Sequence, residues 1–240
     1  MEPLDVLAIG AHPDDVELGC GGTLALLAHQ GRRVGLLHLT RGEMGTRGSE
    51  EQRRREAQRA AEVLGAAEMV ILDCGDGGLR TGAAEEEAVI AELRRLRPEL
   101  VLAPAPADRH PDHGRAHRLV RDACFYAGLR RRGAGEPHRP AALFSFMQHD
   151  PFPPSFLVDV SSVWEVKEAA LEAYQSQLHQ PGREPSGPAT KIGSPQFRSA
   201  LAGRASHFGL LLGVDYAEPF WSSLPLVVAD PMLLLPRGLR

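Results

Sequence analysis

The first half of the chain alternates between short continuous apolar runs and longer segments with helical spacing. Apolar runs of this length predict buried strands, and glycine or proline follows several of the helical segments, as expected at helix ends. The predicted strands are residues 4–10, 33–40, 69–73 and 99–103, and the predicted helices are residues 23–30, 49–64, 85–96 and 116–126. Strands and helices that alternate in this way form βαβ units, so the pattern predicts a Rossmann-like α/β fold with a mostly parallel sheet flanked by helices.

Beyond residue 130 the alternation of apolar runs and helical segments is less regular. The expected elements there are strands at 141–147, 156–160 and 224–229 and helices at 161–178 and 197–208. Residues 180–195 are rich in proline and glycine and predict a loop, either a lid over a substrate or a plain surface connection. The chain contains neither a repeat nor a long linker, so we expect residues 1–240 to form one domain with a looser C-terminal α/β extension.

Composition narrows the class of protein. The chain is 43% hydrophobic and 24% charged, as in globular proteins, and its net charge of -4 offers no general attraction for nucleic acid. The arginine runs 53–55 and 130–132 are typical of solvated faces. The N-terminal residues lack the features of a signal peptide, so a cytoplasmic protein without a membrane partner is expected. Its three cysteines lack CxxC spacing, which argues against a disulfide framework or a thiolate metal site.

A glycine-rich stretch, residues 19–22, follows the first predicted strand and invites a dinucleotide-binding interpretation. The stretch contains no GxGxxG motif, and the carboxylates of Asp14, Asp15 and Glu17 precede it. Carboxylates at this position would repel a pyrophosphate. We therefore expect the glycines to form a turn that lets the backbone approach a different kind of site.

Acidic and imidazole side chains gather after two of the predicted strands. The two clusters are His12, Asp14 and Asp15 after the first strand, and Asp108, His110, Asp112 and His113 after the fourth. Taken singly, each of these residues also fits a turn, a helix cap or a polar strand end. Taken together, they predict one site, because the carboxyl ends of parallel strands meet at one edge of the sheet.

This combination of side chains favours a catalytic metal site. Such zinc sites have three protein ligands and one open position, and mixed histidine and carboxylate ligands suit the ion. His12, Asp15 and His113 can supply the three ligands, which leaves Asp14 free to accept a proton from the attacking water. His110 can act as an acid or a cationic stabiliser, with Asp112 fixing its tautomer.

These motifs resemble the LmbE/PIG-L family of zinc-dependent N-acetylglucosamine deacetylases. The resemblance is carried by residues 11–17, Gly19, Gly21, Gly22 and residues 111–113, with further matching segments at 39–48, 108–113, 172–177 and 216–220. The subfamily that deacetylates N-acetylglucosaminyl malate in bacillithiol biosynthesis is the most similar. A deacetylase for N-acetylglucosamine or a thiol S-conjugate remains an alternative, as does a non-catalytic metal- or sugar-binding module, against which the spare carboxylate of Asp14 argues.

The resemblance implies a role for each site residue. It implies zinc ligands at His12, Asp15 and His113, a general base at Asp14, an assisting histidine at His110 with Asp112 as its partner, and substrate contacts at Arg53, Arg109 and Glu43. Relatives can carry a tyrosine near the active site where this chain has Phe197. Either another donor replaces its hydroxyl here, or zinc and His110 suffice. The same ligands admit Fe2+, Co2+ or Mn2+. A small N-acetylglucosaminyl substrate and a homo-oligomer, a hexamer in many relatives, are also implied.

Overall fold

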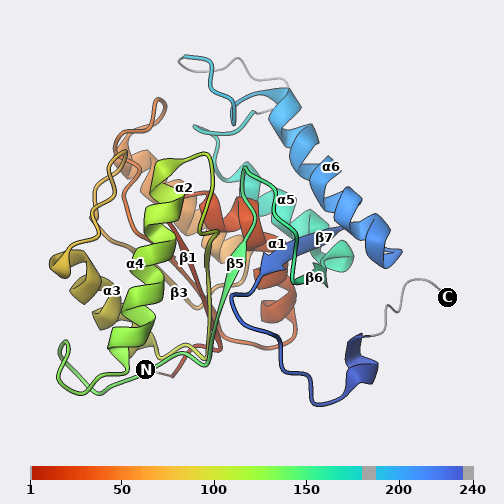
Figure 1. The fold of residues 1–240 in the computed structure, drawn as a ribbon. Coiled ribbons are helices and arrows are strands. Elements are labelled where there is room, and N and C mark those ends of the chain that lie inside the picture. The colour runs from red at the N-terminus through yellow and green to blue at the C-terminus, as the bar shows by residue number, and fades with distance from the viewer. Residues whose placement is uncertain (1, 180–187, 235–240) are drawn as a thin grey trace.

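The computed structural model describes residues 2–179 and 188–234, and its core is one seven-stranded sheet (Figure 1). The strands are β1 (Val6–Gly10), β2 (Val34–His38), β3 (Glu68–Ile71), β4 (Leu100–Pro104), β5 (Ala142–Phe146), β6 (Phe156–Asp159) and β7 (Ala217–Trp221). The helices are α1 (Asp15–His29), α2 (Glu50–Val63), α3 (Ala83–Leu96), α4 (Pro111–Ala127), α5 (Trp164–Glu172) and α6 (Pro195–Leu212), with short 3-10 turns at Ser161–Val163 and Pro231–Leu234. The order of the strands in the sheet is β3-β2-β1-β4-β5-β7-β6.

The sheet is mostly parallel, as the sequence pattern predicts. Strands β1 to β5 run parallel to their neighbours, whereas β7 pairs antiparallel with both β5 and β6. The C-terminal half therefore continues the same sheet instead of forming a looser extension. The Rossmann-like α/β class is confirmed.

Strand β1 shows why the apolar runs are continuous. Val6 and Ala8 pack into one cluster with residues of α1, α2 and α5, while Leu7 and Ile9 pack into another with residues of α3 and α4. Figure 1 shows α3 and α4 on one side of the sheet and α1 and α5 on the other. Because helices cover both faces, every position of the strand is buried and no polar alternation is left.

The predicted glycine turn is wrong. Residues 19–22 lie inside α1, which already begins at Asp15 and is kinked at Cys20. A Cβ atom on Gly19 would overlap the ring of Phe146 in β5. These glycines thus allow a helix to pack closely on the sheet, a contact between distant segments that overrides the local turn preference.

Glu218 of β7 stabilises the kinked helix. Its carboxylate accepts hydrogen bonds from the main-chain N–H groups of Gly22 and Thr23, at 3.0 and 2.7 Å, and from the Thr23 hydroxyl at 2.6 Å. The ammonium group of Lys167 in α5 forms a buried ion pair with the same carboxylate. Glu218 therefore caps the second half of α1 and ties it to both β7 and α5.

Replacing Glu218 by alanine is expected to lower the free energy of unfolding by about 3–5 kcal/mol, because the charge of Lys167 then stays buried without its partner. Urea denaturation followed by circular dichroism measures the change. Glu172→Ala is the matched control, since Glu172 forms an exposed ion pair with Arg198 and such pairs contribute little. Equal stability of the Glu218→Ala variant and the control would contradict this role.

Two C-terminal predictions are also wrong. The last strand is β7 (Ala217–Trp221), whereas residues 224–229 pair with no strand and expose the side chains of Leu224 and Val227. Pro219 disguises β7, because proline is unusual inside a strand. Helix α5 ends at Glu172, short of the predicted residue 178.

Other features of the sequence find a place in the fold. Residues 180–187 of the predicted loop lie outside the described residues, and residues 188–194 lead directly into α6. The three cysteines are buried and unbonded, as expected. None of the helices in the described segments combines the length and apolar character that a membrane span requires.

Candidate active site

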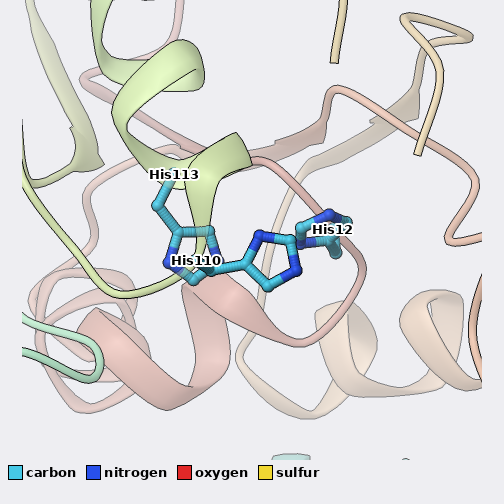
Figure 2. A group of neighbouring side chains, drawn as sticks. All are labelled: His12, His110 and His113. Atoms are coloured by element: carbon cyan, nitrogen blue, oxygen red, sulfur yellow. The ribbon is translucent and has the colours of Figure 1, made fainter. Parts of the chain in front are cut away.

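The site lies where β1 and β4, neighbours in the sheet, reach their carboxyl ends. His12 follows β1, whereas His110 and His113 lie at the start of α4, directly after the loop that leaves β4. Figure 2 shows the three imidazoles gathered at this point. The ring centre of His110 is 4.8 Å from that of His12 and 5.0 Å from that of His113. The prediction that the two sequence clusters meet at one edge is confirmed.

The turn after β1 is tight and holds Asp14 in an uncommon conformation. The φ angle of Asp14 is 107°, in a region that L-residues other than asparagine and aspartate rarely adopt. The next residue, Asp15, begins α1, and its Oδ2 accepts the main-chain N–H of His12 at 2.8 Å. Backbone strain of this kind is typical of functional sites, where it fixes the direction of a side chain.

Helix α4 begins five residues earlier than the sequence pattern indicates. Pro111 occupies its first turn and His110 caps it, with the His110 Nδ1 accepting the main-chain N–H of Asp112 at 3.3 Å. An accepting Nδ1 leaves the proton of the neutral imidazole on Nε2. Burial, together with the charges of His12 and His113, lowers the pKa of His110 and favours that neutral form.

Asp15 lies between two histidines at distances that suit a shared metal ion. Its Oδ2 is 3.4 Å from His12 Nδ1, and its Oδ1 is 3.3 Å from His113 Nε2. Ligand atoms about 2.0–2.1 Å from a tetrahedral zinc ion lie about 3.4 Å from one another. Nitrogen atoms of His12, His110 and His113 also lie within 4.8 Å of one another. The three imidazoles form a compact donor group in which His12 and His113 are buried and His110 is half-buried. The Asp15 carboxylate faces two of them, so these donors suit a divalent metal ion.

Carboxylates and an amide orient these donors. Asp108 Oδ1 lies 2.9 Å from His113 Nδ1, and Asp76 Oδ1 lies 3.0 Å from His12 Nε2. Gln148 donates its side-chain N–H to Asp15 Oδ1 at 2.6 Å. Such outer partners fix the orientation of metal ligands and raise their basicity.

Three residues of the site, Asp76, Gln148 and His149, belong to neither of the two sequence clusters. The ring of His149 stacks on that of His113 at 5.7 Å, and its main-chain N–H donates to Asp108. Asp76 and Gln148 both lie a few residues beyond the ends of strands, β3 and β5. The strand-end rule that marks His12 and His113 would therefore have found them as well.

The expected pairing of the Asp112 carboxylate with His110 is wrong. Only the main chain of Asp112 reaches the His110 ring. Its Oδ1 accepts hydrogen bonds from the Leu79 N–H and the Arg115 guanidinium, and its Oδ2 lies 3.5 Å from His12 Nε2. The side chain is held toward the loop after β3, so its charge acts on His12.

Asp14 is a buried carboxylate in the wall of the same cavity as His12, Asp15 and His113. It is 5% exposed, its Oδ2 accepts no hydrogen bond from any described residue, and the nearest cation is the Arg53 guanidinium at 3.6 Å. Burial raises the pKa of Asp14 to about 7, although the charge of Arg53 opposes the shift. A carboxylate with a pKa near neutrality is suited to take up a proton and release it again.

Of the three residues expected to contact the substrate, two line the cavity beside the histidines and one does not. Arg109 is exposed and lines a cavity of about 260 Å³ together with the histidines and Asp14. Arg53 also lines it, but its guanidinium is engaged by the carbonyls of Gly42 and Pro13, at 2.9 and 2.7 Å. Glu43 does not line the cavity, because its two oxygens accept main-chain N–H groups of the loops around it.

Comparisons with known proteins agree with this geometry. The family profile described as PIG-L, GlcNAc-PI de-N-acetylase, matches residues 7–124. The chain is 33% identical to the diacetylchitobiose deacetylase of Thermococcus kodakarensis over 229 residues, which cover 89% of this chain and 80% of the relative. It is 30% identical to the 4-oxalmesaconate hydratase of Pseudomonas putida over 190 residues, 72% of this chain and 74% of the relative.

A solved structure extends the similarity to nearly the whole fold. The conserved protein TT1542 from Thermus thermophilus superposes with a TM-score of 0.85 at 43% sequence identity, covering 95% of this chain and 98% of that one. The chain belongs to the PIG-L/LmbE family of deacetylases. It is an enzyme of the amidohydrolase class.

Proposed function

We propose that this enzyme removes the acetyl group from an N-acetylglucosaminyl conjugate, with N-acetyl-α-D-glucosaminyl L-malate as its substrate and zinc held by His12, Asp15 and His113. The observation that carries the proposal is the buried carboxylate of Asp14, which is free of hydrogen bonds within the described residues beside a fitting ligand set. A protein that only binds a metal or a sugar gains nothing from a buried carboxylate without a hydrogen bond, because its desolvation is costly and its ion-pair partner Arg53 lies 3.6 Å away.

The positions of the side chains support the following reaction. When bound, zinc supplies a Lewis acid for the amide carbonyl and lowers the pKa of water at the site. Asp14 accepts the proton of the water that attacks the carbonyl carbon. The Nε2–H of neutral His110 donates a hydrogen bond to the oxygen that gains negative charge. Asp14, now protonated, returns its proton to the amine as the carbon–nitrogen bond breaks, and acetate and the free amine leave.

The choice of a malate conjugate rests on the sequence resemblance and on the Arg109 side chain in the cavity wall. Arg109 forms no ion pair with any described residue, so its guanidinium is available to a carboxylate of the substrate. A guanidinium can bind a carboxylate through two parallel hydrogen bonds. The relatives named above act on different molecules, according to their names, so the group attached to the sugar is the part of the proposal that needs a direct test.

The test is a comparison of substrates with the zinc-loaded enzyme. Acetate release is measured for N-acetylglucosaminyl malate, N-acetylglucosamine and N,N'-diacetylchitobiose, and hydration is measured for 4-oxalmesaconate. The expected result is the highest kcat/KM for the malate conjugate. If acetate were released fastest from N-acetylglucosamine or diacetylchitobiose, that compound would replace the malate conjugate as the proposed substrate. Hydration of 4-oxalmesaconate without any acetate release would overturn the proposed reaction.

A further inference from the structure

A second cavity, of about 180 Å³, adjoins the metal cavity. The two share Leu18, His149 and Lys191 in their walls. The remaining wall of the second cavity comes from Gln148 and from residues of α6, among them Phe197 and Arg204. We call this cavity the side pocket. None of its lining residues takes part in the proposed reaction.

Arg204 is a partly buried cation without a carboxylate partner in the described residues. Its guanidinium donates to the main-chain carbonyls of Gln148 and, at 3.4 Å, of Leu18. Burial lowers the pKa of this guanidinium, against the more distant charges of Glu218 and Asp108. A guanidinium has five N–H donors, so two carbonyls leave donors unused at the wall of the side pocket.

The rest of the side pocket favours an anion. Its lining contains no aspartate or glutamate among the described residues. Lys191, at the junction of the two cavities, adds a second positive charge and forms no ion pair with any described residue. The ring of Phe197, 6.3 Å from that of His149, supplies an apolar surface.

Hydrogen bonds also connect the wall of the side pocket to the metal site. Arg204 holds the main-chain carbonyl of Gln148, and the side chain of the same glutamine donates to the ligand Asp15. Because the two cavities share wall residues, a molecule whose acetamide lies in the metal cavity can extend past His149 and Lys191 into the side pocket. Arg53, in contrast, already uses its guanidinium on two carbonyls and Asp14.

We propose that Arg204, assisted by Lys191, binds a carboxylate on the group attached to the sugar and thereby selects acidic conjugates. This inference rests on the proposed function and assigns to it a specificity residue. Phe197 then serves as an apolar wall of this subsite.

The experiment measures binding by calorimetry to the zinc-loaded Asp14→Asn protein, in which substrate survives. The two ligands are N-acetylglucosaminyl malate and its dimethyl ester, which lacks the two negative charges and carries two additional methyl groups. Adding Arg204→Met is expected to weaken binding of the diacid by about 10- to 100-fold, the loss typical for hydrogen bonds to a charged group, and to leave the ester unaffected. Arg198→Met, on the same helix but paired with Glu172, is the matched control and should change neither.

Two further variants guard against a folding defect. Arg204→Lys keeps the charge and should recover part of the diacid binding, and Lys191→Met, at an exposed position, should weaken diacid binding with an unchanged melting temperature. Equal losses for the diacid and the ester would show that Arg204 merely supports the wall, and no loss for either would place the carboxylate elsewhere. Both results overturn the inference.

Failure of the subsite is distinguishable from failure of the proposed function. A wild-type enzyme that binds the diacid through Arg204 but releases no acetate from it would refute the function and keep the subsite. Hydrolysis of the diacid and the ester with equal kcat/KM would refute the subsite and keep the function.

Discussion

Asparagine in place of Asp14 is expected to lower kcat for deacetylation by about 10²- to 10⁴-fold, the range that a general base contributes. The variant should keep its zinc, because the carboxylate lies outside the proposed ligand set and its ion-pair partner among the described residues is the Arg53 guanidinium, at 3.6 Å. Asparagine also tolerates the positive φ of this position, so the turn after β1 should persist. Acetate release and metal content, measured on the same preparation, test both halves of the prediction.

Asp73→Asn is the matched control for this variant. Asp73 is an exposed carboxylate just beyond β3, at the same edge of the sheet, and its partner is the Arg41 side chain at 3.4 Å. Its replacement should leave kcat unchanged. If Asp14→Asn retained nearly full kcat, Asp14 would not be the base. If it lost its zinc, Asp14 would be a ligand instead.

Alanine in place of His113 is expected to remove the metal and with it all measurable deacetylation. Even the loss of an outer partner costs about 10- to 100-fold in metal affinity, so the loss of a ligand should cost at least about 100-fold. His113 is almost fully buried, and its two nitrogens lie near Asp15 and Asp108. Zinc affinity is measured by competition with a chelating dye.

Arg118→Ala tests whether a change on the same helix suffices to disturb the site. Arg118 is exposed on α4, about one turn and a half beyond His113, and should bind zinc as the wild type does. Undiminished zinc affinity in His113→Ala would remove His113 from the ligand set and favour a set built on other donors.

The elements that the sequence predicts well are those fixed by local patterns. The continuous apolar run of β1 and the capping of α2 by Ser49, whose hydroxyl accepts the Gln52 N–H at 3.2 Å, are both present. The path of α1 is not local. It depends on the fit of Gly19 against Phe146 and on the Glu218 carboxylate, which are contributed by strands far along the chain.

The same distinction, between local sequence patterns and contacts from distant segments, applies to the candidate site. His12, Asp15 and His113 are predictable as a group, because two dense polar clusters follow two buried strands. Asp76 and Gln148 also follow strands, β3 and β5, but they lie outside the two dense clusters, and the order of the sheet brings Asp76 to His12 and Gln148 to Asp15. The Asp112 carboxylate faces His12 because the loop after β3 holds it there, through the Leu79 N–H.

The most direct test of the proposed chemistry is acetate release from N-acetylglucosaminyl malate before and after metal removal. Enzyme treated with a chelator should release none, and added zinc should restore the release of one acetate for each free amine formed. Undiminished release by the metal-free enzyme would contradict a metal-dependent mechanism. Absence of release from any N-acetylglucosaminyl compound by the zinc-loaded enzyme would contradict the proposed function.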